Sequence, residues 1–587
     1  MSEVYDIVLS YEKVRNHLEN NPKDKSKILK MVDEIKGDYR ESVVGATTKL
    51  LDKTFLKLYD SVNLNLPESF SIRELQKKYH LILVPNHQSH ADYIALQYIL
   101  YKHDKIPVYI AGGINLNVFP IGNLFRRCGA FFIRRKFDDE LYKIACQGYI
   151  YYLLKSDKVV EFFFEGGRTR TGKLLPPKYG LFSMLLDAHS KFDDKKPLMF
   201  IPVSIAHEMI PEEKAHAKEL EGRKKEKEST AQLLKIFQLF NKKMGSVHVN
   251  FGKGIVVNEY DDLKRKTQDL AFECFREVGR CMPVTPSSLL AMIMLDEPSG
   301  ALTWKQIENS ALEIINYCSY MNIPVTDSLK IEVYSKSLKV AMDMFINNKK
   351  ADLIKREKLN QVFYTLNDEG RVHLLYHKNM ILHHFLVAGI INATWFNIFN
   401  GNITTAMDLT KFLVTKRKEL KYEFYLPTVK EMITEAIKVV EYSVGSKIDR
   451  LDEALDFTAE KLYKVASSVR RFSSAFSYIY EAYYISVTSV KYIGHEPFNE
   501  DRFLQVSKEL FSMEREHGRV VRYPESYTVP KMKMTLDYLK NLNVISFDEI
   551  SSTYKLEEVE KVNYMIEKFA RDVNDQVSIN LKFNQGE

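Results

Sequence analysis

The residues with the clearest potential for chemistry are His87 and Asp92, which lie five positions apart in segment 81–93. An imidazole can accept a proton from a hydroxyl group near neutral pH. A carboxylate on the other ring nitrogen fixes the tautomer and stabilises the imidazolium that forms. The pair therefore predicts a general base with its orienting acid.

Two elements must hold this pair in place. Residues 81–84 form a short apolar run that ends at Pro85, which is typical of a buried strand. Asp92 opens a segment, residues 93–100, whose apolar side chains recur at helical spacing. We therefore expect the two side chains at a strand-to-helix corner, where catalytic groups are commonly displayed.

The same spacing recurs at His189 and Asp194, so spacing alone does not identify a site. The second pair lies in a polar run, residues 187–196, that no strand precedes. We interpret it as a solvated loop. Three further blocks accompany the first pair and distinguish it.

These blocks are residues 129–135, 159–173 and 198–206, each an apolar strand-like run. The first two end in cations, among them Arg135, Arg168 and Arg170. Guanidinium groups bind phosphate oxygens with charge-assisted, often bidentate hydrogen bonds. Arginines at the ends of two neighbouring strands could therefore converge on one phosphate group. Glu165, beside these cations, is either an ion-pair partner of an arginine or an acid–base group.

Segment 167–173 also matches the phosphate-loop spacing G-x-x-x-x-G-K. Leu174 stands where a Ser or Thr should coordinate magnesium, and Pro176 and Pro177 obstruct the helix that should follow. Nucleotide hydrolysis is therefore a distant second function.

The four blocks, in this order, resemble the glycerol-3-phosphate and dihydroxyacetone-phosphate acyltransferase family, and most closely the bacterial membrane-associated glycerol-3-phosphate 1-O-acyltransferases. The resemblance covers residues 40–255 with high specificity and continues more weakly into the C-terminal half. Two positions depart from the bacterial pattern. Gln88 replaces a common arginine, and His207 stands where an aromatic residue is usual. Acceptor choice could shift accordingly.

The resemblance implies acyl transfer from an acyl-CoA or acyl-carrier-protein thioester to the sn-1 hydroxyl of glycerol 3-phosphate, without a metal or cofactor. It implies His87 as general base, Asp92 as its partner and Glu165 as a third residue needed for turnover. The residues it implies for the glycerol-phosphate site are Phe132, Ile133, Arg135, Arg168, Arg170 and Pro202.

The resemblance also implies a protein at the cytoplasmic face of a membrane, the cell inner membrane if bacterial. The alternatives are a dihydroxyacetone-phosphate acyltransferase and, lower, a lysophosphatidate 2-acyltransferase. From another class, a non-catalytic lipid- or phosphate-binding membrane protein remains open.

Composition is compatible with such an enzyme. The chain has 587 residues with 45% hydrophobic content, enough for two or three domains. Its five cysteines are odd in number and lack C-x-x-C spacing, so we expect neither a disulfide framework nor a zinc site, and a reducing compartment. The net charge of +7 weakly favours an anionic surface, and no aromatic-basic motif indicates nucleic-acid binding.

Membrane signals within the chain are weak. The first residues lack the pattern of a secretory signal. We find no uninterrupted apolar stretch of about 18 residues, the length of a spanning helix. The nearest, Met380 to Phe396, is better interpreted as a buried helix.

The predicted fold is an α/β glycerolipid acyltransferase-like mixed sheet flanked by helices. We expect an N-terminal helical region (1–75), an α/β domain (76–282) with strands beginning near residues 81, 107, 130, 159, 198 and 247, and a large helical C-terminal domain (283–587). Segment 45–59 could contact a membrane, although packing on its own domain is favoured. Segment 212–228 is predicted to be an exposed helix and a candidate contact for the acyl carrier.

Overall fold

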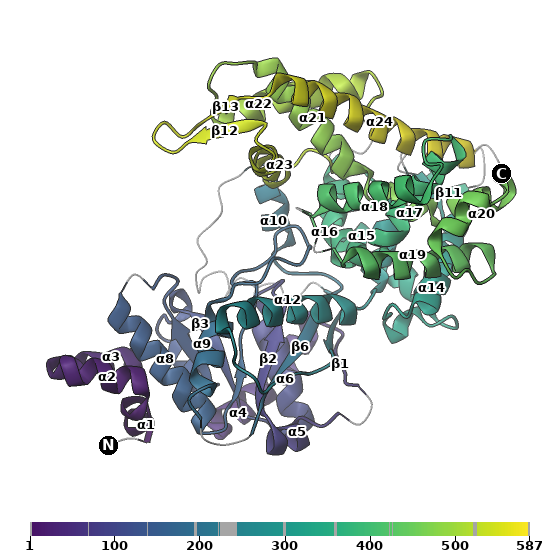
Figure 1. Ribbon diagram of the computed structural model, residues 1–587. Helices are drawn as coiled ribbons and strands as arrows, with labels where there is room; N and C mark the ends of the chain where they lie inside the picture. The colour runs from purple at the N-terminus through teal and green to yellow at the C-terminus, as the bar shows by residue number, and fades with distance from the viewer. Residues whose placement is uncertain are drawn as a thin grey trace. The chain divides into compact units, whose positions relative to one another are not determined.

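The computed structural model describes residues 3–67, 70–137, 139–192, 196–220, 222, 243–297, 301–356, 361–421, 423–424, 426–520 and 525–584. The chain divides into two compact units (Figure 1). Unit 1 comprises Met1–Thr169, Leu174–Glu212 and Glu226–Pro283. Unit 2 comprises Arg170–Lys173, Glu213–Lys225 and Val284–Glu587. A segment of four residues within the third sequence block thus belongs to unit 2, whereas the residues on either side of it belong to unit 1.

Unit 1 is built on a mixed sheet with the strand order β1-β7-β6-β2-β5-β3-β4, and β8 pairs with β6. Its strands are β1 (Ser61–Asn65), β2 (His80–Pro85), β3 (Val108–Gly113), β4 (Ala130–Ile133), β5 (Val159–Glu161), β6 (Leu198–His207), β7 (Ser246–Phe251) and β8 (Ile255–Val257). The central pairings β6–β2–β5–β3–β4 are parallel, and β6 runs antiparallel to β7 and β8. This confirms the predicted mixed α/β sheet.

Unit 1 contains helices α1 (Glu3–Ser10), α2 (Glu12–Asn20), α3 (Lys25–Ile35), α4 (Glu41–Leu58), α5 (Ile72–Lys78), α6 (Ala91–Asp104), α7 (Ile121–Arg127), α8 (Glu140–Lys155), α9 (Gly180–His189) and α12 (Leu263–Cys281). The chain passes from β2 through α6 to β3 in one direction across the sheet. It passes from β4 through α8 to β5, and through α9 to β6, in the opposite direction. Because parallel crossovers are right-handed, α6 covers one face of the sheet and α8 and α9 cover the other.

This topology creates a switch point between β2 and β5. These strands are parallel neighbours, yet the helices that follow them lie on opposite faces. In open α/β sheets, ligands bind in the crevice outside the carboxyl ends of such strands. The loops after Pro85 and Glu161, which carry the first and third sequence blocks, therefore meet at the expected position of a site.

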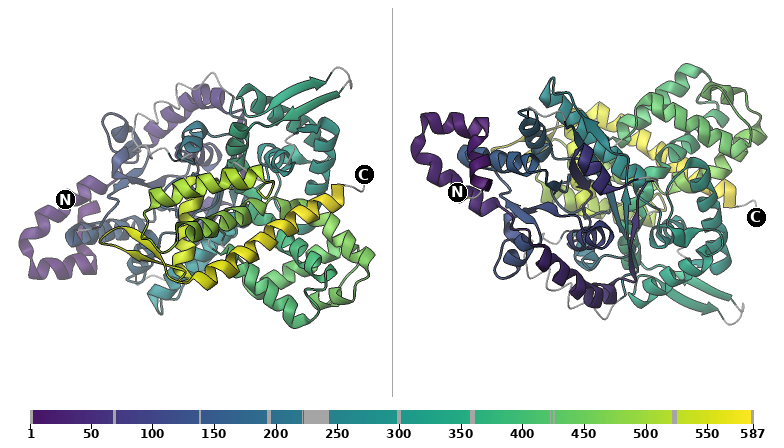
Figure 2. Two further views of the ribbon diagram at one scale, coloured as in Figure 1. Left: turned by 90° about the horizontal axis from the view of Figure 1, so that it is seen from above. Right: turned by 90° about the horizontal axis from the view of Figure 1, so that it is seen from below.

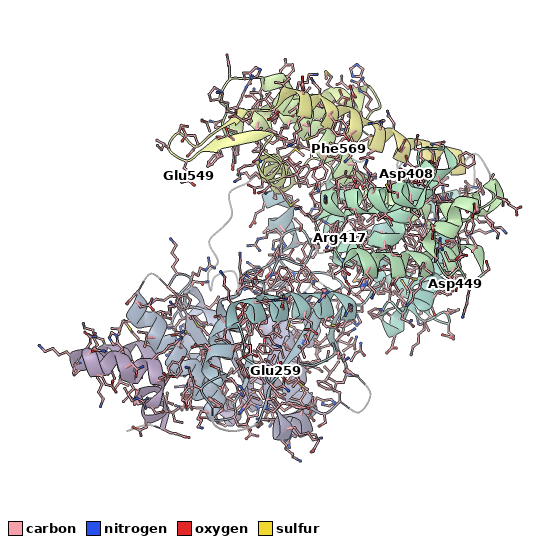
Figure 3. The ribbon with its side chains drawn as sticks, in the orientation of Figure 1. Glu259, Asp408, Arg417, Asp449, Glu549 and Phe569 are labelled. Atoms are coloured by element: carbon pink, nitrogen blue, oxygen red, sulfur yellow. The ribbon has the colours of Figure 1, made fainter. Side chains whose placement is uncertain are left out.

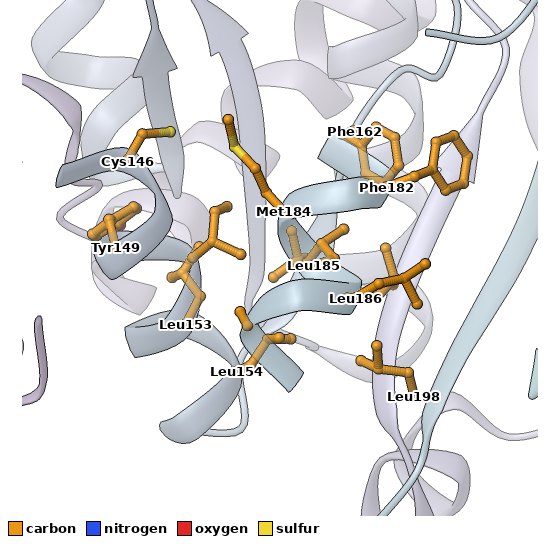
Figure 4. Close-up of a cluster of buried hydrophobic side chains, with 14 of the residues drawn as sticks. Cys146, Tyr149, Leu153, Leu154, Phe162, Phe182, Met184, Leu185, Leu186 and Leu198 are labelled. Carbon is orange, nitrogen blue, oxygen red and sulfur yellow. The ribbon is translucent and has the colours of Figure 1, made fainter. Parts of the chain in front are cut away.

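The core of unit 1 lies between the sheet and helices α8, α9 and α12. Figure 4 shows side chains of α8, among them Leu153, and of α9, among them Leu185, in this cluster. Phe162 and Phe182 pack edge to face, with ring centroids 4.9 Å apart. Helices α1, α2 and α3 pack against α8 at one side of the unit (purple in Figure 2). Burial of this apolar surface fixes the strands and hence the loops at their carboxyl ends.

All six predicted strands of the α/β region are present, as β2 to β7. Strands β1 and β8 were not predicted. Strand β1 consists of Ser61–Asn65, in which Val62 and Leu64 alternate with polar residues; this short period-2 pattern is a strand signal that was overlooked. It pairs in parallel with β7, within the segment for which we expected only helices.

Unit 2 is mainly helical, as predicted. Its helices are α10 (Glu213–Leu220), α13 (Pro286–Asp296), α14 (Trp304–Met321), α15 (Tyr334–Asn347), α16 (Asp368–Ile381), α17 (Leu386–Phe399), α18 (Ala406–Leu420), α19 (Val429–Val444), α20 (Ala459–Ser474), α21 (Ser477–Ile493), α22 (Glu500–Glu516), α23 (Val529–Asn541) and α24 (Val559–Asn584). Helix α24, yellow in Figure 2, packs along α21.

Two small sheets in unit 2 were not predicted. They contain β9 (Ala301–Thr303), β10 (Asp352–Arg356) and β11 (Gln361–Thr365), and the hairpin of β12 (Ile545–Asp548) and β13 (Thr553–Leu556). The strands are short and lie between strong helical patterns, so they produced no clear periodicity.

The helical run 368–399, formed by α16, a 3₁₀ turn and α17, is long and apolar enough to cross a membrane by length and composition. We had expected no such run. The most apolar window of this run is 72% buried within the described residues, however, as befits a core helix of unit 2. The expectation of a buried helix at 380–396 is therefore confirmed.

The two segments proposed as contact surfaces behave differently from each other. In α4, Phe55 and Leu58 are buried in unit 1 while Lys49 and Lys53 are exposed, so packing on its own unit is confirmed. The prediction of an exposed helix at 212–228 is wrong for its described part. Helix α10 buries Glu213, His216, Ala217 and Leu220, and the carboxylate of Glu213 contacts His377 of unit 2.

Candidate active site

His87 and Asp92 form the predicted pair at the corner between β2 and α6. The Nδ1 of His87 lies 2.8 Å from Oδ2 of Asp92, and both side chains are buried, with 5% and 0% of their surface exposed. Because a carboxylate only accepts hydrogen bonds, Nδ1 carries the proton and donates it. In the neutral ring the other nitrogen, Nε2, therefore presents a lone pair, as a general base requires.

Asp92 is held by four hydrogen bonds. Its Oδ2 accepts the backbone N–H groups of Gln88 and Ser89, at 2.6 and 2.9 Å, in addition to His87. Its Oδ1 accepts Nε2 of His207 at 2.6 Å. Burial by itself raises the pKa of Asp92, but the hydrogen bonds from His207 and His87 outweigh it and hold the pKa well below its ordinary value. Asp92 is thus a carboxylate throughout the physiological range.

Two aromatic side chains pack against the ring of His87. The ring of Phe163 lies 4.2 Å from the imidazole, centroid to centroid, and Tyr93 packs edge-on at 5.1 Å. The hydroxyl of Tyr93 lies 3.1 Å from Nε2 and donates its proton to the lone pair there. A phenol hydroxyl therefore occupies the position at which a substrate hydroxyl would have to donate.

The loop after β5 fixes the backbone of His87. Oε2 of Glu165 accepts the N–H of His87 at 3.3 Å, and the N–H of Thr169 donates to the carbonyl of His87 at 2.9 Å. The other carboxyl oxygen of Glu165 accepts the N–H of Leu175 at 3.2 Å. Among the described residues no arginine forms an ion pair with Glu165, contrary to one of the two hypotheses for this residue. Glu165 joins two loops through their backbones.

The buried position of Glu165 also disfavours the charged form of its carboxyl group. Burial raises its pKa well above the usual value, and the two backbone N–H donors offset this only in part. The raised pKa favours an uncharged carboxyl group next to the backbone of His87.

Arg168 is linked to the site through Glu212. Its Nη1 lies 3.0 Å from Oε1 of Glu212, and that carboxylate also accepts the hydroxyl of Ser89 at 2.8 Å and the N–H of His90 at 3.0 Å. Arg168 and Glu212 thus buttress the turn between His87 and Asp92. Sequence reasoning missed Glu212, which lies 123 positions from Ser89.

Arg170 belongs to unit 2. Its Nε lies 3.0 Å from Oε2 of Glu219, and its Nη1 contacts Nε2 of His216 at 2.9 Å, both on α10. The expectation that Arg168 and Arg170 act on one phosphate group stays a prediction, since the two side chains lie in different units and each has a carboxylate partner of its own.

The rest of segment 170–173 is anchored in unit 2 as well. The side-chain amide of Asn379 donates to the carbonyl of Thr171 at 2.8 Å, and Lys173 forms an ion pair with Glu423. Gly172 has φ +82, and a Cβ there would lie 2.0 Å from the carbonyl oxygen of Tyr376. This position requires glycine for both its conformation and the close backbone contact.

The remaining predicted substrate-site residues are distributed along the sheet. Arg135 is exposed after β4, but β3 separates β4 from β5, so the expectation of arginines on neighbouring strands is wrong. Phe132 is buried in β4 under the guanidinium of Arg126, and Ile133 is half-buried. Pro202 is buried in β6 opposite Val84. Their role towards glycerol phosphate stays a prediction.

The interpretation of the second His–Asp pair as part of a solvated loop is wrong for His189. His189 is 6% exposed at the end of α9, where Nε2 contacts the carbonyl of Lys196 at 2.9 Å and Nδ1 contacts the hydroxyl of Tyr260. It is a structural core histidine and not part of a solvated loop. Asp194 lies outside the described residues.

A surface pocket of about 340 Å³ lies at the amino ends of β2, β3 and β5, lined by Arg73, Lys77, Lys105 and Asp157 among others. The candidate site lies after the carboxyl ends of β2 and β5, so the pocket is not part of it. In the part of the chain that the structure describes, no group of three His, Cys, Asp or Glu side chains is arranged to hold a metal ion.

Comparison with known proteins agrees with this geometry. A family model described as "Acyltransferase" matches residues 69–206, which contain both halves of the site. The fold and site of unit 1 thus place it among the acyltransferases. A second model, "Glycerol-3-phosphate acyltransferase C-terminal region", matches residues 216–548, more than half of the chain. The chain belongs to the glycerol-3-phosphate acyltransferase family.

Individual relatives agree with this assignment. A glycerol-3-phosphate acyltransferase of Pseudoalteromonas atlantica is 31% identical over 438 residues, 67% of this chain and 51% of the relative. One of Glaesserella parasuis is 31% identical over 401 residues, 65% of this chain and 48% of the relative. This chain therefore spans about half the length of the relatives it matches.

A solved 1-acyl-sn-glycerophosphate acyltransferase from Thermotoga maritima is 16% identical and covers 40% of this chain and 77% of its own, with a TM-score of 0.24. That score is too low to support an argument about fold or function.

Proposed function

We propose that this protein transfers a fatty acyl group from an acyl-CoA or acyl-carrier-protein thioester to the sn-1 hydroxyl of glycerol 3-phosphate, giving lysophosphatidate and the free carrier thiol. The observation that carries the proposal is the buried His87–Asp92 pair, with Nε2 presenting a lone pair at the switch point of an acyltransferase-family sheet. Membership of the glycerol-3-phosphate acyltransferase family supports the choice of acceptor.

The reaction follows from the protonation states. As the acceptor oxygen attacks the thioester carbonyl carbon, its proton moves to Nε2 of His87. The tetrahedral intermediate then collapses, the C–S bond breaks, and the thiolate takes the proton from Nε2. His87 thus returns to its starting state. General-base action of this kind contributes on the order of 10²- to 10⁴-fold.

Asp92 has a fixed role in this sequence. It stays ionised, so its charge stabilises the imidazolium of His87 while that cation exists. Its four hydrogen bonds also prevent the carboxylate from rotating away from Nδ1. The acceptor hydroxyl must displace the hydroxyl of Tyr93 from Nε2 before it can react.

The substrates are tested by measuring release of the carrier thiol and formation of acylated product. Long-chain acyl-CoA and acyl-carrier protein are each combined with glycerol 3-phosphate and with dihydroxyacetone phosphate. We expect 1-acyl-glycerol 3-phosphate as the main product. A preference for dihydroxyacetone phosphate would mean that this compound is the acceptor instead. If the protein binds acceptor or lipid but no combination of donor and acceptor gives product, it is a non-catalytic protein.

We further propose that unit 1 associates with the cytoplasmic face of a membrane, the cell inner membrane if the source is bacterial. The support is an exposed apolar stretch after the carboxyl end of β3, where Val118, Phe119 and Leu124 are 47%, 82% and 42% exposed. Exposed Lys136, after β4, lies at the same edge of the sheet. Apolar side chains beside a cation suit the headgroup region of an anionic bilayer.

This association is tested by sedimentation with vesicles of phosphatidylethanolamine and phosphatidylglycerol. Replacing Val118 and Phe119 together by serine should lower the bound-to-free ratio about tenfold or more, because two apolar side chains no longer enter the bilayer. The control is Ile550→Ser, an exposed apolar side chain of unit 2 beside Glu549 in the β12–β13 turn (Figure 3). Equal binding of parent and double variant would refute the proposed surface.

A further inference from the structure

Asp92 has a second histidine partner, His207, which the predicted dyad does not include and whose protonation state the mechanism above does not use. Among the residues that the structure describes, Oδ2 of Asp92 accepts three donors, whereas Oδ1 accepts only Nε2 of His207, at 2.6 Å. Both side chains are completely buried, so water cannot replace that donor. We propose that His207 is a positioning residue of the acyl transfer, a neutral donor that holds Asp92 in its ionised, oriented state for His87. The inference rests on the proposed function.

The hydrogen bonds identify the form of the His207 ring. Its Nδ1 is buried and has no hydrogen-bond partner among the described residues. A protonated ring would leave an N–H donor buried without an acceptor at Nδ1, which is costly. The ring is therefore neutral, with its proton on Nε2, and it donates to Oδ1 without adding a positive charge.

Neutrality at His207 matters for the reaction. A cationic His207 would compete with the imidazolium of His87 for the single negative charge of Asp92. A neutral donor instead satisfies Oδ1 and leaves that charge available to the ring that accepts the substrate proton. The carboxylate of Asp92 thus lies between two imidazoles, and only that of His87 changes charge during the reaction.

Neighbouring strands of the sheet and a buried aromatic ring hold His207 in place. It is the last residue of β6, is paired with Val247 of β7, and packs against the buried ring of Tyr59, with centroids 5.6 Å apart. Because β6 is the parallel neighbour of β2, its carboxyl end brings His207 to the same edge as the strand before His87. The strand order thus selects this position, 115 residues from Asp92, as the support of the carboxylate.

The test compares two substitutions with a matched control. His207→Leu removes the donor, whereas His207→Gln retains an N–H donor without a titratable ring. The control is His189→Leu, which removes another buried histidine of unit 1 that has no contact with Asp92. The kcat and the KM for glycerol 3-phosphate are measured for each variant with a long-chain acyl thioester, and unfolding midpoints are recorded.

We expect His207→Leu to lower kcat by about 10- to 100-fold, the range for losing one hydrogen bond to a buried charge, with KM unchanged. His207→Gln should recover most of that loss, and His189→Leu should keep the parental kcat. Parental kcat in His207→Leu would overturn the proposal. So would equal losses in the Leu and Gln variants, because a role in packing alone would make the donor irrelevant.

A second readout does not require turnover. In the full-length protein labelled with ¹⁵N-histidine, the ring nitrogens of His207 should report a neutral Nε2–H tautomer from pH 6 to 8, with Nδ1 unprotonated. A protonated Nδ1 would contradict the proposal. If the parent protein acylates neither acceptor, the proposed function fails while this measurement still decides the state of His207.

Discussion

Glu161 provides a quantitative test of the electrostatics beneath the site. It lies in β5 with its side chain fully buried, and neither carboxyl oxygen has a hydrogen-bond partner within the described residues. Burial, and secondarily the charge of Asp92, raises the pKa of Glu161 from 4.5 to about 8. The native protein therefore keeps a proton at neutral pH that the unfolded chain releases.

The sign of the effect on stability follows directly. Between the unfolded pKa and the folded one, the native state binds the extra proton, so stability falls as pH rises. Each pH unit in that window costs about 1.4 kcal/mol. From pH 5.5 to pH 8 this one group lowers the free energy of unfolding by about 3 kcal/mol. Below pH 4.5 the folded and unfolded states both bind the proton, so the group no longer makes stability depend on pH.

Glu161→Gln retains the shape of the side chain but does not titrate. We expect the free energy of unfolding of the variant to increase relative to that of the parent as pH rises, by about 3 kcal/mol between pH 5.5 and pH 8. The assay is native-state hydrogen exchange of peptides from β2 and β5, corrected for intrinsic rates. Fluorescence is unsuitable, because Trp304 and Trp395 both lie in unit 2.

The gain corresponds to about two orders of magnitude in the exchange rates of globally protected amides at pH 8. Glu259→Gln is the control, since Glu259 is an exposed glutamate of unit 1 (Figure 3). A parent-to-variant difference that stays constant from pH 5.5 to pH 8 would refute the reasoning, because it would mean that Glu161 is ionised in the folded protein.

Two further substitutions test the site and its loop. Tyr93→Phe should raise kcat/KM for glycerol 3-phosphate by up to about tenfold, because the phenol hydroxyl no longer competes for Nε2 of His87. Steady-state kinetics measure this. A fall in kcat/KM of more than tenfold would instead mean that the hydroxyl takes part in the chemistry. Gly172→Ala should destabilise unit 2 by about 1–3 kcal/mol, since it strains the backbone and collides with Tyr376, and tryptophan fluorescence during denaturation measures this. Gly445→Ala, at a glycine of unit 2 with φ +71 whose Cβ would meet nothing within 4 Å, is the matched control, and an equal midpoint for the two variants would contradict the assigned contact.

Local patterns in the sequence were sufficient for much of the fold and for the catalytic pair. The apolar run before His87 and the helical spacing after Asp92 specify a strand and a helix, and five positions between the two side chains are enough to bring them together. The helical C-terminal half was predicted for the same reason. Such signals depend only on neighbouring residues.

Contacts between distant segments could not be predicted in this way. His207 and Glu212 reach the site only because β6 lies beside β2, and no spacing rule contains the strand order. The insertion of β3 between β4 and β5 likewise separates Arg135 from Arg168. The departure at His207 from the family pattern was visible in the sequence, but its partner was not.

The central claim is that Nε2 of His87 removes the proton from the acceptor hydroxyl. The most direct measurement is the rate of 1-acyl-glycerol 3-phosphate formation by parent, His87→Ala and His189→Ala proteins at saturating acyl thioester and glycerol 3-phosphate. We predict that the rate falls about 10²- to 10⁴-fold in His87→Ala while its unfolding midpoint is unchanged, and that His189→Ala keeps the parental rate. Equal rates for His87→Ala and the parent would contradict the account.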